Sequence, residues 1–297
     1  MTKLIPLLLG LALLAAPPLP AEQAPLPAGG KVVKDLAYVP GGHVRQKLDL
    51  YLPAKPTGPI LVWIHGGGWV GGSRTDEVPG LQLLALGYTI ASVDYRFSTD
   101  APFPAQIEDC KAAIRWLRAN AATYGYDPKR LAAWGGSAGG HLTALLATTG
   151  VIRDFDVGEN LDQSSAIRCG IDFSGPTDFP AWKPASANPG IQRSGADSLL
   201  TKLLGGEMME KAELARRASP VTWISKETAP LYLLHGDADE IVGVEQSLEL
   251  AVLMKAVGVE VVLDIVPGAD HAGMGFWKDP NRPQRLADFF AKYLAAP

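Results

Sequence analysis

The chain has 297 residues and a formal net charge of −4, from 27 Lys and Arg against 31 Asp and Glu. A slightly acidic chain without a basic run argues against nucleic acid as a partner. The two cysteines form no Cys-x-x-Cys pair or Cys/His cluster, which argues against a structural zinc site. We expect neither a metal nor another cofactor.

The N-terminus has the pattern of a secretory signal peptide over residues 1–21. One lysine precedes an apolar run at 4–16, and small residues and prolines follow it. The run is shorter than the ~20 apolar residues of a membrane-spanning helix. We therefore expect cleavage near Ala16 or Ala21, export to the periplasm or medium, and no membrane segment in the mature form. An uncleaved anchor is the alternative. Residues 22–30, rich in Pro, Ala and Gly, predict a linker.

Residues 31–297 show no second shift in composition or internal repeat, which predicts one domain. The strands predicted from apolar and alternating runs cover residues 46–52, 60–64, 88–93, 130–134, 168–173, 231–234 and 261–266. Helical patterns fall at 81–86, 105–122, 138–148, 244–257 and 284–294. Such alternation predicts an α/β fold, with a mostly parallel sheet of about eight strands and helices on both faces. The 46–52 strand is expected to be antiparallel.

The two cysteines allow two interpretations. Cys110 lies on the apolar face of the 105–122 helix, and Cys169 opens an apolar strand. This favours two separately buried thiols, although export would permit a disulfide.

A strand, a glycine-rich turn and a helix meet at residues 131–141. Within this stretch, Gly135-Gly136-Ser137-Ala138-Gly139 fits the G-x-S-x-G nucleophile elbow. The serine of such an elbow occupies a tight strand-to-helix turn, so the residues two positions away cannot carry side chains. We therefore predict that Ser137 is a nucleophile at the N-terminus of a helix, where free N–H groups stabilise negative charge.

A second glycine-rich loop follows the strand at 60–64 and reads His65-Gly66-Gly67-Gly68-Trp69. This is the H-G-G-G oxyanion-loop motif. Its glycines leave the backbone free to turn N–H groups toward a ligand. We expect one N–H, from Gly67 or Gly68, to act with the N–H of Ala138 on the oxygen that becomes negative during acyl transfer.

A serine hydroxyl needs a base to become a nucleophile, and we select His271 from the five histidines. His271 lies in the turn at 267–273, after the last predicted core strand. In a parallel sheet, that turn and Ser137 lie at the same edge.

The other histidines fit structural roles better. His65 belongs to the oxyanion loop, which its ring would pin by hydrogen bonds. His141 lies one turn after the serine on the same helix, and its side chain points along the helix wall. His235 ends an apolar strand, as a buried structural residue would. His43 sits in a Gly-Gly-His turn far upstream.

The base needs an acid that fixes its tautomer and stabilises its charged form. Residues 234–242 follow a predicted strand and offer three carboxylates. We select Asp239, because the turn after Gly236 should bring it over the sheet edge. Asp237 is the alternative, with loop capping as its structural role. The resulting order along the chain is Ser, Asp, His, as expected for α/β-hydrolases.

These residues give the chain a resemblance to the α/β-hydrolase superfamily over nearly all of the mature sequence. It is most similar to the carboxylesterase branch that includes hormone-sensitive-lipase-like esterases and bacterial feruloyl and acetylxylan esterases. The resemblance implies a catalytic triad of Ser137, Asp239 and His271, with Asp94 and Arg96 bracing the loops around the elbow. The matching segments are 65–69, 93–96, 102–105, 135–141, 175–178 and 235–239.

Three departures bear on the branch. Gly136 stands where hormone-sensitive-lipase-like esterases carry an Asp, and the chain has little room for their N-terminal helical cap. Both favour the feruloyl/acetylxylan-type branch. Gly243 stands where a Pro is common, which should not move Asp239. The weakly patterned stretch 179–219 predicts a small cap-like insertion over the site, with a helix near 199–204.

The sequence therefore predicts a secreted serine carboxylester hydrolase that works through an acyl-enzyme. Its expected substrates are small-molecule or carbohydrate esters, such as short-chain acyl, acetylated-sugar or feruloyl-type esters. Two alternatives stay open: a serine peptidase or amidase of the same fold, and a catalytically silent binding module.

Overall fold

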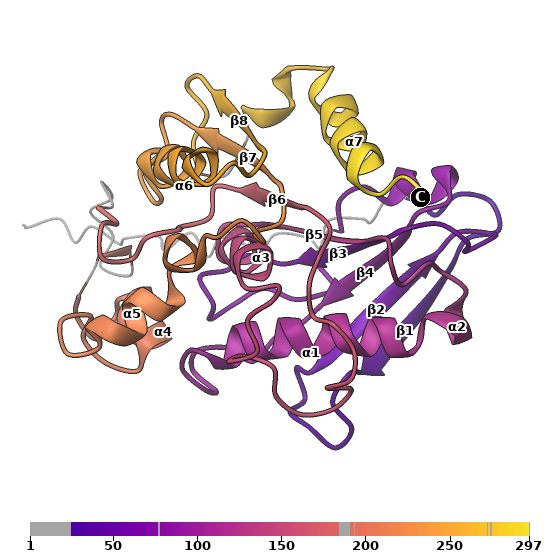
Figure 1. Cartoon of the computed structure of the whole chain (residues 1–297), viewed down its shortest axis with the longest axis horizontal. Coiled ribbons are helices and arrows are strands. Elements are labelled where there is room, and N and C mark those ends of the chain that lie inside the picture. Colours follow the sequence, from indigo (N-terminus) through magenta and orange to yellow (C-terminus); the bar gives the residue numbers. More distant parts are fainter. Residues whose placement is uncertain are drawn as a thin grey trace, which may run out of the picture.

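The computed structural model describes residues 25–76, 78–183, 191–192, 194–271, 273 and 275–296. Eight strands form one sheet in the order β1-β2-β4-β3-β5-β6-β7-β8, which crosses the whole molecule (Figure 1). The strands are β1 (Lys31–Ala37), β2 (Lys47–Leu52), β3 (Ile60–Ile64), β4 (Thr89–Val93), β5 (Leu131–Gly136), β6 (Gly170–Phe173), β7 (Leu231–Gly236) and β8 (Val261–Val266).

Strand direction follows the predicted pattern. The β1–β2 and β2–β4 pairs are antiparallel, and the five pairs from β4–β3 to β7–β8 are parallel. The central strands are continuous apolar runs because helices cover them on both faces. These observations confirm the predicted fold, including its mostly parallel sheet and the antiparallel strand near the start.

Helices divide between the two faces of the sheet. One face is covered by α1, α3 and α6, through residues such as Ile114, Leu145 and Met254. The other is covered by η1 and α7, through Leu84 and Phe290. The bounds are η1 (Leu81–Leu86), α1 (Ala105–Ala119), α2 (Ala121–Tyr124), α3 (Ala138–Thr148), α4 (Leu199–Leu204), α5 (Ala212–Ala218), η3 (Pro220–Trp223), α6 (Glu245–Ala256), η4 (Phe276–Lys278) and α7 (Arg282–Tyr293).

The structure differs from the predicted elements in a few places. The pattern at 81–86 forms a 3-10 helix, and the pattern at 105–122 is split into α1 and α2 at Asn120. Strand β1 was not predicted, because it is an edge strand with a mostly exposed sequence that lacks apolar alternation. Helix α5 was also missed; it is short and largely solvent-facing.

Cys110 and Cys169 are free and buried, so they follow the first of the two interpretations. In the described part of the chain, no helix is both long and apolar enough to span a bilayer. The predicted signal peptide lies outside the described residues, as do residues 22–24 of the predicted linker.

Candidate active site

Ser137 occupies the turn between β5 and α3 in a strained conformation. Its φ of 55° and ψ of −117° lie in a region that non-glycine residues rarely adopt. A Cβ added at Gly135 would lie 2.5 Å from the Gly139 backbone, and one added at Gly139 would lie 2.0 Å from the Ile64 carbonyl oxygen. The two glycines therefore permit the close approach of β3, β5 and α3 that this turn requires.

Ser137, His271 and Asp239 form one hydrogen-bonded line. The Nε2 of His271 lies 2.9 Å from the Oγ of Ser137, and its Nδ1 lies 2.7 Å from the Oδ2 of Asp239. A carboxylate accepts hydrogen bonds, so Nδ1 carries the proton and Nε2 is free to accept the serine proton. The structure thus brings together the three residues that the sequence analysis selected.

Asp239 is held in place as a charged group. Its Oδ1 accepts the N–H groups of Ile241 at 2.9 Å and Val242 at 2.8 Å. Burial acts to raise the pKa of Asp239, but hydrogen bonds from His235, His271 and the backbone together hold that pKa well below its usual range. The carboxylate therefore stays ionised and can balance positive charge on His271.

Asp237, the alternative acid, does something else. Its Oδ1 accepts the N–H of Gly268 at 2.6 Å, in the turn that leads to His271. This is the loop-capping role that the sequence analysis gave as its structural interpretation.

His141 is a fully buried residue of α3. Its Nδ1 accepts the indole N–H of Trp69 at 3.1 Å, and its Nε2 donates to the carbonyl of Ala218 at 2.7 Å. Burial lowers the pKa of His141 to about 4, so the ring is neutral near pH 7. Both ring nitrogens are therefore occupied away from Ser137. His43 lies on the surface, where its Nε2 is 4.0 Å from the Oδ2 of Asp100.

The oxyanion loop carries three successive residues with positive φ: Gly67 at 101°, Gly68 at 59° and Trp69 at 60°. A Cβ at Gly67 would lie 2.3 Å from the Gly71 carbonyl oxygen, so this position requires glycine. Within the described chain, the N–H groups of Gly67 and Gly68 donate to no protein atom. Both glycines line the same cavity as Ser137. Ala138, the next residue after that serine, begins α3.

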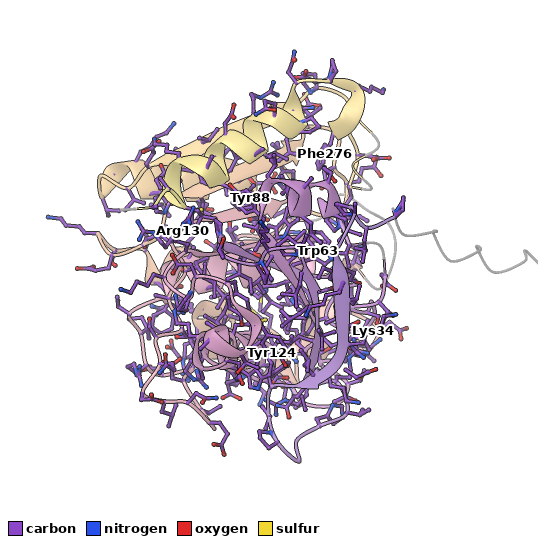
Figure 2. The ribbon with its side chains drawn as sticks, turned by 90° about the vertical axis from the view of Figure 1, so that its right-hand side faces the viewer. Lys34, Trp63, Tyr88, Tyr124, Arg130 and Phe276 are labelled. Carbon is purple, nitrogen blue, oxygen red and sulfur yellow. The ribbon has the colours of Figure 1, made fainter. Side chains whose placement is uncertain are left out.

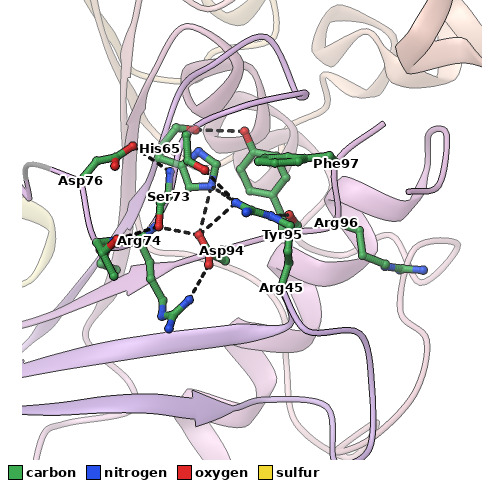
Figure 3. A network of polar contacts seen from close by, with 12 residues as sticks. Arg45, His65, Ser73, Arg74, Asp76, Asp94, Tyr95, Arg96 and Phe97 are labelled. Carbon is green, nitrogen blue, oxygen red and sulfur yellow. Dashed lines mark hydrogen bonds and ion pairs between the residues drawn. The ribbon is translucent and has the colours of Figure 1, made fainter. Parts of the chain in front are cut away.

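Tyr95 holds the start of this loop (Figure 3). Its hydroxyl donates to the carbonyl of His65 at 3.1 Å and more weakly to that of Gly66 at 3.4 Å. The His65 ring stacks on the Tyr95 ring with centroids 4.4 Å apart, and its Nδ1 donates to the Gly66 carbonyl at 2.8 Å. These contacts fix the backbone just before the predicted oxyanion donors.

Asp94 anchors the other side of the His65 ring (Figure 3). Its Oδ1 lies 3.4 Å from the Nε2 of His65 and accepts the backbone N–H of Arg74 at 2.7 Å. The guanidinium groups of Arg74 and Arg45 also donate to this carboxylate. Arg45 and Arg74 were missed in the sequence analysis, because no local motif connects them to the loop.

A cavity of about 490 Å³ opens in front of Ser137. Trp63 and Phe276, labelled in Figure 2, belong to its largely apolar wall. Ile191 and Leu199, from the stretch predicted as an insertion, also line it; a Cβ at Gly68 would lie 2.5 Å from Leu199 Cδ1. The other lining residues are Gly66, Gly67, Pro79, Trp134, Gly136, Phe173, Ser174, Ile241, His271 and Gly273.

Among the described residues, no group of three or more His, Cys, Asp or Glu side chains is arranged to hold a metal ion.

Comparison with known proteins connects this geometry to a family. The family model described as BD-FAE matches residues 48–254. Probable carboxylic ester hydrolase LipM of Mycobacterium tuberculosis is 30% identical over 250 residues, which cover 80% of this chain and 55% of LipM. The chain thus spans little more than half the length of that curated relative.

Two solved structures are similar over most of the chain. A truncated carbohydrate esterase from gut microbiota has a TM-score of 0.80 and 28% identity, with 90% of this chain and 97% of that chain covered. The propionate-bound esterase Est2 of Thermogutta terrifontis has a TM-score of 0.65 and 28% identity, with 91% and 97% covered.

Proposed function

This chain belongs to the BD-FAE family, and a carbohydrate esterase is among the solved structures similar to it; on that basis we propose that the protein is a serine carboxylester hydrolase. One observation carries the proposal: the Oγ of Ser137 lies 2.9 Å from an imidazole nitrogen whose ring is oriented by Asp239. This is the geometry that a nucleophile and its general base require.

In the first half of the reaction, the Nε2 of His271 takes the proton of Ser137 as Oγ attacks the ester carbonyl carbon. The carbonyl oxygen becomes negative and accepts N–H groups of Gly67 or Gly68 and of Ala138. Asp239 balances the charge on the imidazolium. The tetrahedral intermediate then collapses; His271 returns its proton to the leaving alkoxide, and the alcohol departs from an acyl-enzyme on Ser137.

Water completes the second half. His271 removes a proton from the water molecule as its oxygen attacks the acyl carbon, and the same donors hold the second oxyanion. Collapse of this intermediate breaks the bond to Ser137 Oγ, which regains its proton from His271. The products are one alcohol and one carboxylic acid, and the residues return to their starting states.

We extend the proposal to short-chain acyl, acetylated-sugar or feruloyl-type esters as substrates. The apolar cavity beside Ser137 suits an apolar acyl or alcohol group. A carbohydrate esterase and a propionate-bound esterase are among the similar structures. The sequence over residues 1–21 supports export of the enzyme before it acts.

Turnover of a substrate panel tests this proposal. Purified protein is assayed with p-nitrophenyl acetate, butyrate and octanoate, acetylated xylan, methyl ferulate, and p-nitroanilides of the same acyl groups. We expect ester turnover that is highest for acetyl or butyryl groups and lost in Ser137→Ala. Faster anilide than ester turnover would favour the amidase alternative. An inert wild-type protein would favour the silent binding module.

A further inference from the structure

A second histidine contacts the carboxylate that orients the base. His235 is the penultimate residue of β7 and has no exposed area. Its Nε2 lies 2.7 Å from the carbonyl oxygen of Val242 and 3.3 Å from the Oδ2 of Asp239. Its Nδ1 lies 2.7 Å from the Oγ of Ser247 on α6. Both nitrogens of a fully buried ring are therefore in contact with polar partners.

These contacts determine where the proton of His235 lies. A carbonyl oxygen and a carboxylate oxygen both accept hydrogen bonds, so Nε2 must carry a proton. The hydroxyl of Ser247 can donate to Nδ1 of the neutral ring. The neutral Nε2–H tautomer thus gives both ring nitrogens a hydrogen-bond partner without placing a positive charge in the core.

In that state, the Oδ2 of Asp239 lies 2.7 Å from the Nδ1–H of His271 and 3.3 Å from the Nε2 of His235, whose proton is donated to the Val242 carbonyl at 2.7 Å. We propose that His235 is a positioning residue for the reaction, which holds Asp239 in the orientation that His271 needs and tempers its attraction for the imidazolium. This inference rests on the proposed hydrolase function, because it assigns His235 a role in the same site.

The expected effect follows from competition at one oxygen atom. The Nε2–H of His235, 3.3 Å from Oδ2, stabilises the charged carboxylate, which lowers the affinity of Asp239 for the proton shared with His271. Loss of the His235 donor should strengthen the attraction between Asp239 and the imidazolium. The rising limb of kcat/KM should therefore move to higher pH by about 0.5 pH unit.

Other titratable groups near this pair must be separated from the effect. Asp172, on the neighbouring strand β6, interacts electrostatically with His235, and its Oδ1 accepts the N–H of Gly175 at 2.8 Å. Burial raises the pKa of Asp172 to about 6. His271 contacts the pair across the carboxylate, and the α6 contact is the uncharged Ser247. An Asp172→Asn background removes the titration of the neighbouring carboxylate.

Two substitutions at position 235 differ in whether they keep an N–H donor at the place of the histidine Nε2. The amide nitrogen of Gln can occupy the place of the histidine Nε2, so His235→Gln retains a donor to Val242 and Asp239. His235→Asn places its amide nitrogen near the former Nδ1 and removes that donor. Thermal unfolding and titration with a fluorophosphonate establish how much of each variant is folded and competent.

We expect His235→Asn to lower kcat about tenfold with little change in KM. The rising limb of its kcat/KM profile should move to higher pH, in the wild-type and the Asp172→Asn backgrounds alike. His235→Gln should restore the wild-type limb. A folded His235→Asn variant with an unmoved limb would overturn the inference, as would a Gln variant that moves it as far as Asn does.

A measurement without turnover covers the case in which the Asn variant does not fold. Wild-type protein labelled with ¹⁵N-histidine is examined by NMR for the tautomer of His235, assigned through His235→Gln. The Nε2–H tautomer supports the inference, and the Nδ1–H tautomer overturns it. If wild type hydrolyses no ester, the proposed function fails instead, and the tautomer result still stands by itself.

Discussion

The Oδ2 of Asp239 lies 2.7 Å from the Nδ1 of His271, although 32 positions separate the two residues along the chain. Strands β7 and β8 bring them together, because both residues lie in loops that follow the carboxyl ends of adjacent parallel strands. The contact sets the imidazole tautomer and therefore decides which nitrogen faces Ser137.

Asp239→Asn should lower kcat by about 10⁴-fold while the protein stays folded. The amide cannot stabilise the imidazolium and favours the wrong tautomer of His271. Steady-state kinetics on p-nitrophenyl acetate measures the effect.

Asp237→Asn is the matched control, since Asp237 contacts the N–H of Gly268 and lies in the same loop as Asp239. Its amide oxygen can still accept that hydrogen bond, so we expect less than a tenfold change in kcat. A larger loss for Asp237→Asn than for Asp239→Asn would show that the acid has been assigned to the wrong carboxylate.

Tyr95→Phe should lower kcat about tenfold and leave KM nearly unchanged. The hydroxyl holds the carbonyls of His65 and Gly66, and its loss loosens the loop whose N–H groups would meet the oxyanion. Tyr126→Phe is the control, because its buried hydroxyl also donates to a backbone carbonyl, that of Leu117, at 2.7 Å. Equal losses of kcat in the two variants would contradict a role in the loop.

Gly139→Ala should lower the free energy of unfolding, on the order of 2 kcal/mol, and impair the elbow. Its new methyl group would lie 2.0 Å from the Ile64 carbonyl oxygen. Gly136→Ala is the matched variant in the same turn, since a Cβ there meets nothing within 4 Å. Denaturant unfolding should rank Gly136→Ala close to wild type. Two equally stable variants would refute the steric explanation of the glycine pattern.

Asp172 predicts a pH dependence of stability. Burial raises its pKa from 3.8 to about 6, so the folded state holds this proton over a range in which the unfolded chain has lost it. The contribution of Asp172 to the free energy of unfolding therefore falls as the pH rises from 4 to 6, by up to roughly 3 kcal/mol.

Asp172→Asn removes this ionisation. Relative to wild type, the variant should gain stability as the pH rises through that window, in urea unfolding at pH 4, 5, 6 and 7. A constant difference between the two proteins across these pH values would contradict a protonated Asp172 in the folded state.

Sequence patterns predicted most of the fold because the central strands are buried on both faces. The run at Ile60–Ile64 is apolar for that reason, and the α3 pattern coincides with its helix at both ends. Strand β1 lacks such a signal because it lies at the edge of the sheet, where it pairs with β2 alone, and most of its side chains face solvent. The exposed α5 lacks it for a similar reason.

The site residues could be selected from their positions after predicted strands as much as from their residue types. Ser137, Asp239 and His271 could be chosen because each follows a recognisable apolar strand, and parallel strands align their carboxyl ends. Arg45 and Arg74 donate to Asp94, and the Tyr95 hydroxyl donates to the His65 carbonyl of the oxyanion loop; these long-range contacts cannot be deduced from one sequence. The contact from His235 to Asp239 depends on how residues 237–242 fold back over β7, which the matching segment 235–239 does not specify.

The central claim is that Ser137 is the nucleophile that becomes acylated. The most direct test is to react the protein with a fluorophosphonate, measure the intact mass and map the adduct by peptide mass spectrometry, with Ser137→Ala in parallel. The account predicts one adduct per molecule, on Ser137, and both labelling and ester turnover absent from the folded Ser137→Ala variant. An adduct on another residue, or full turnover by Ser137→Ala, would contradict it.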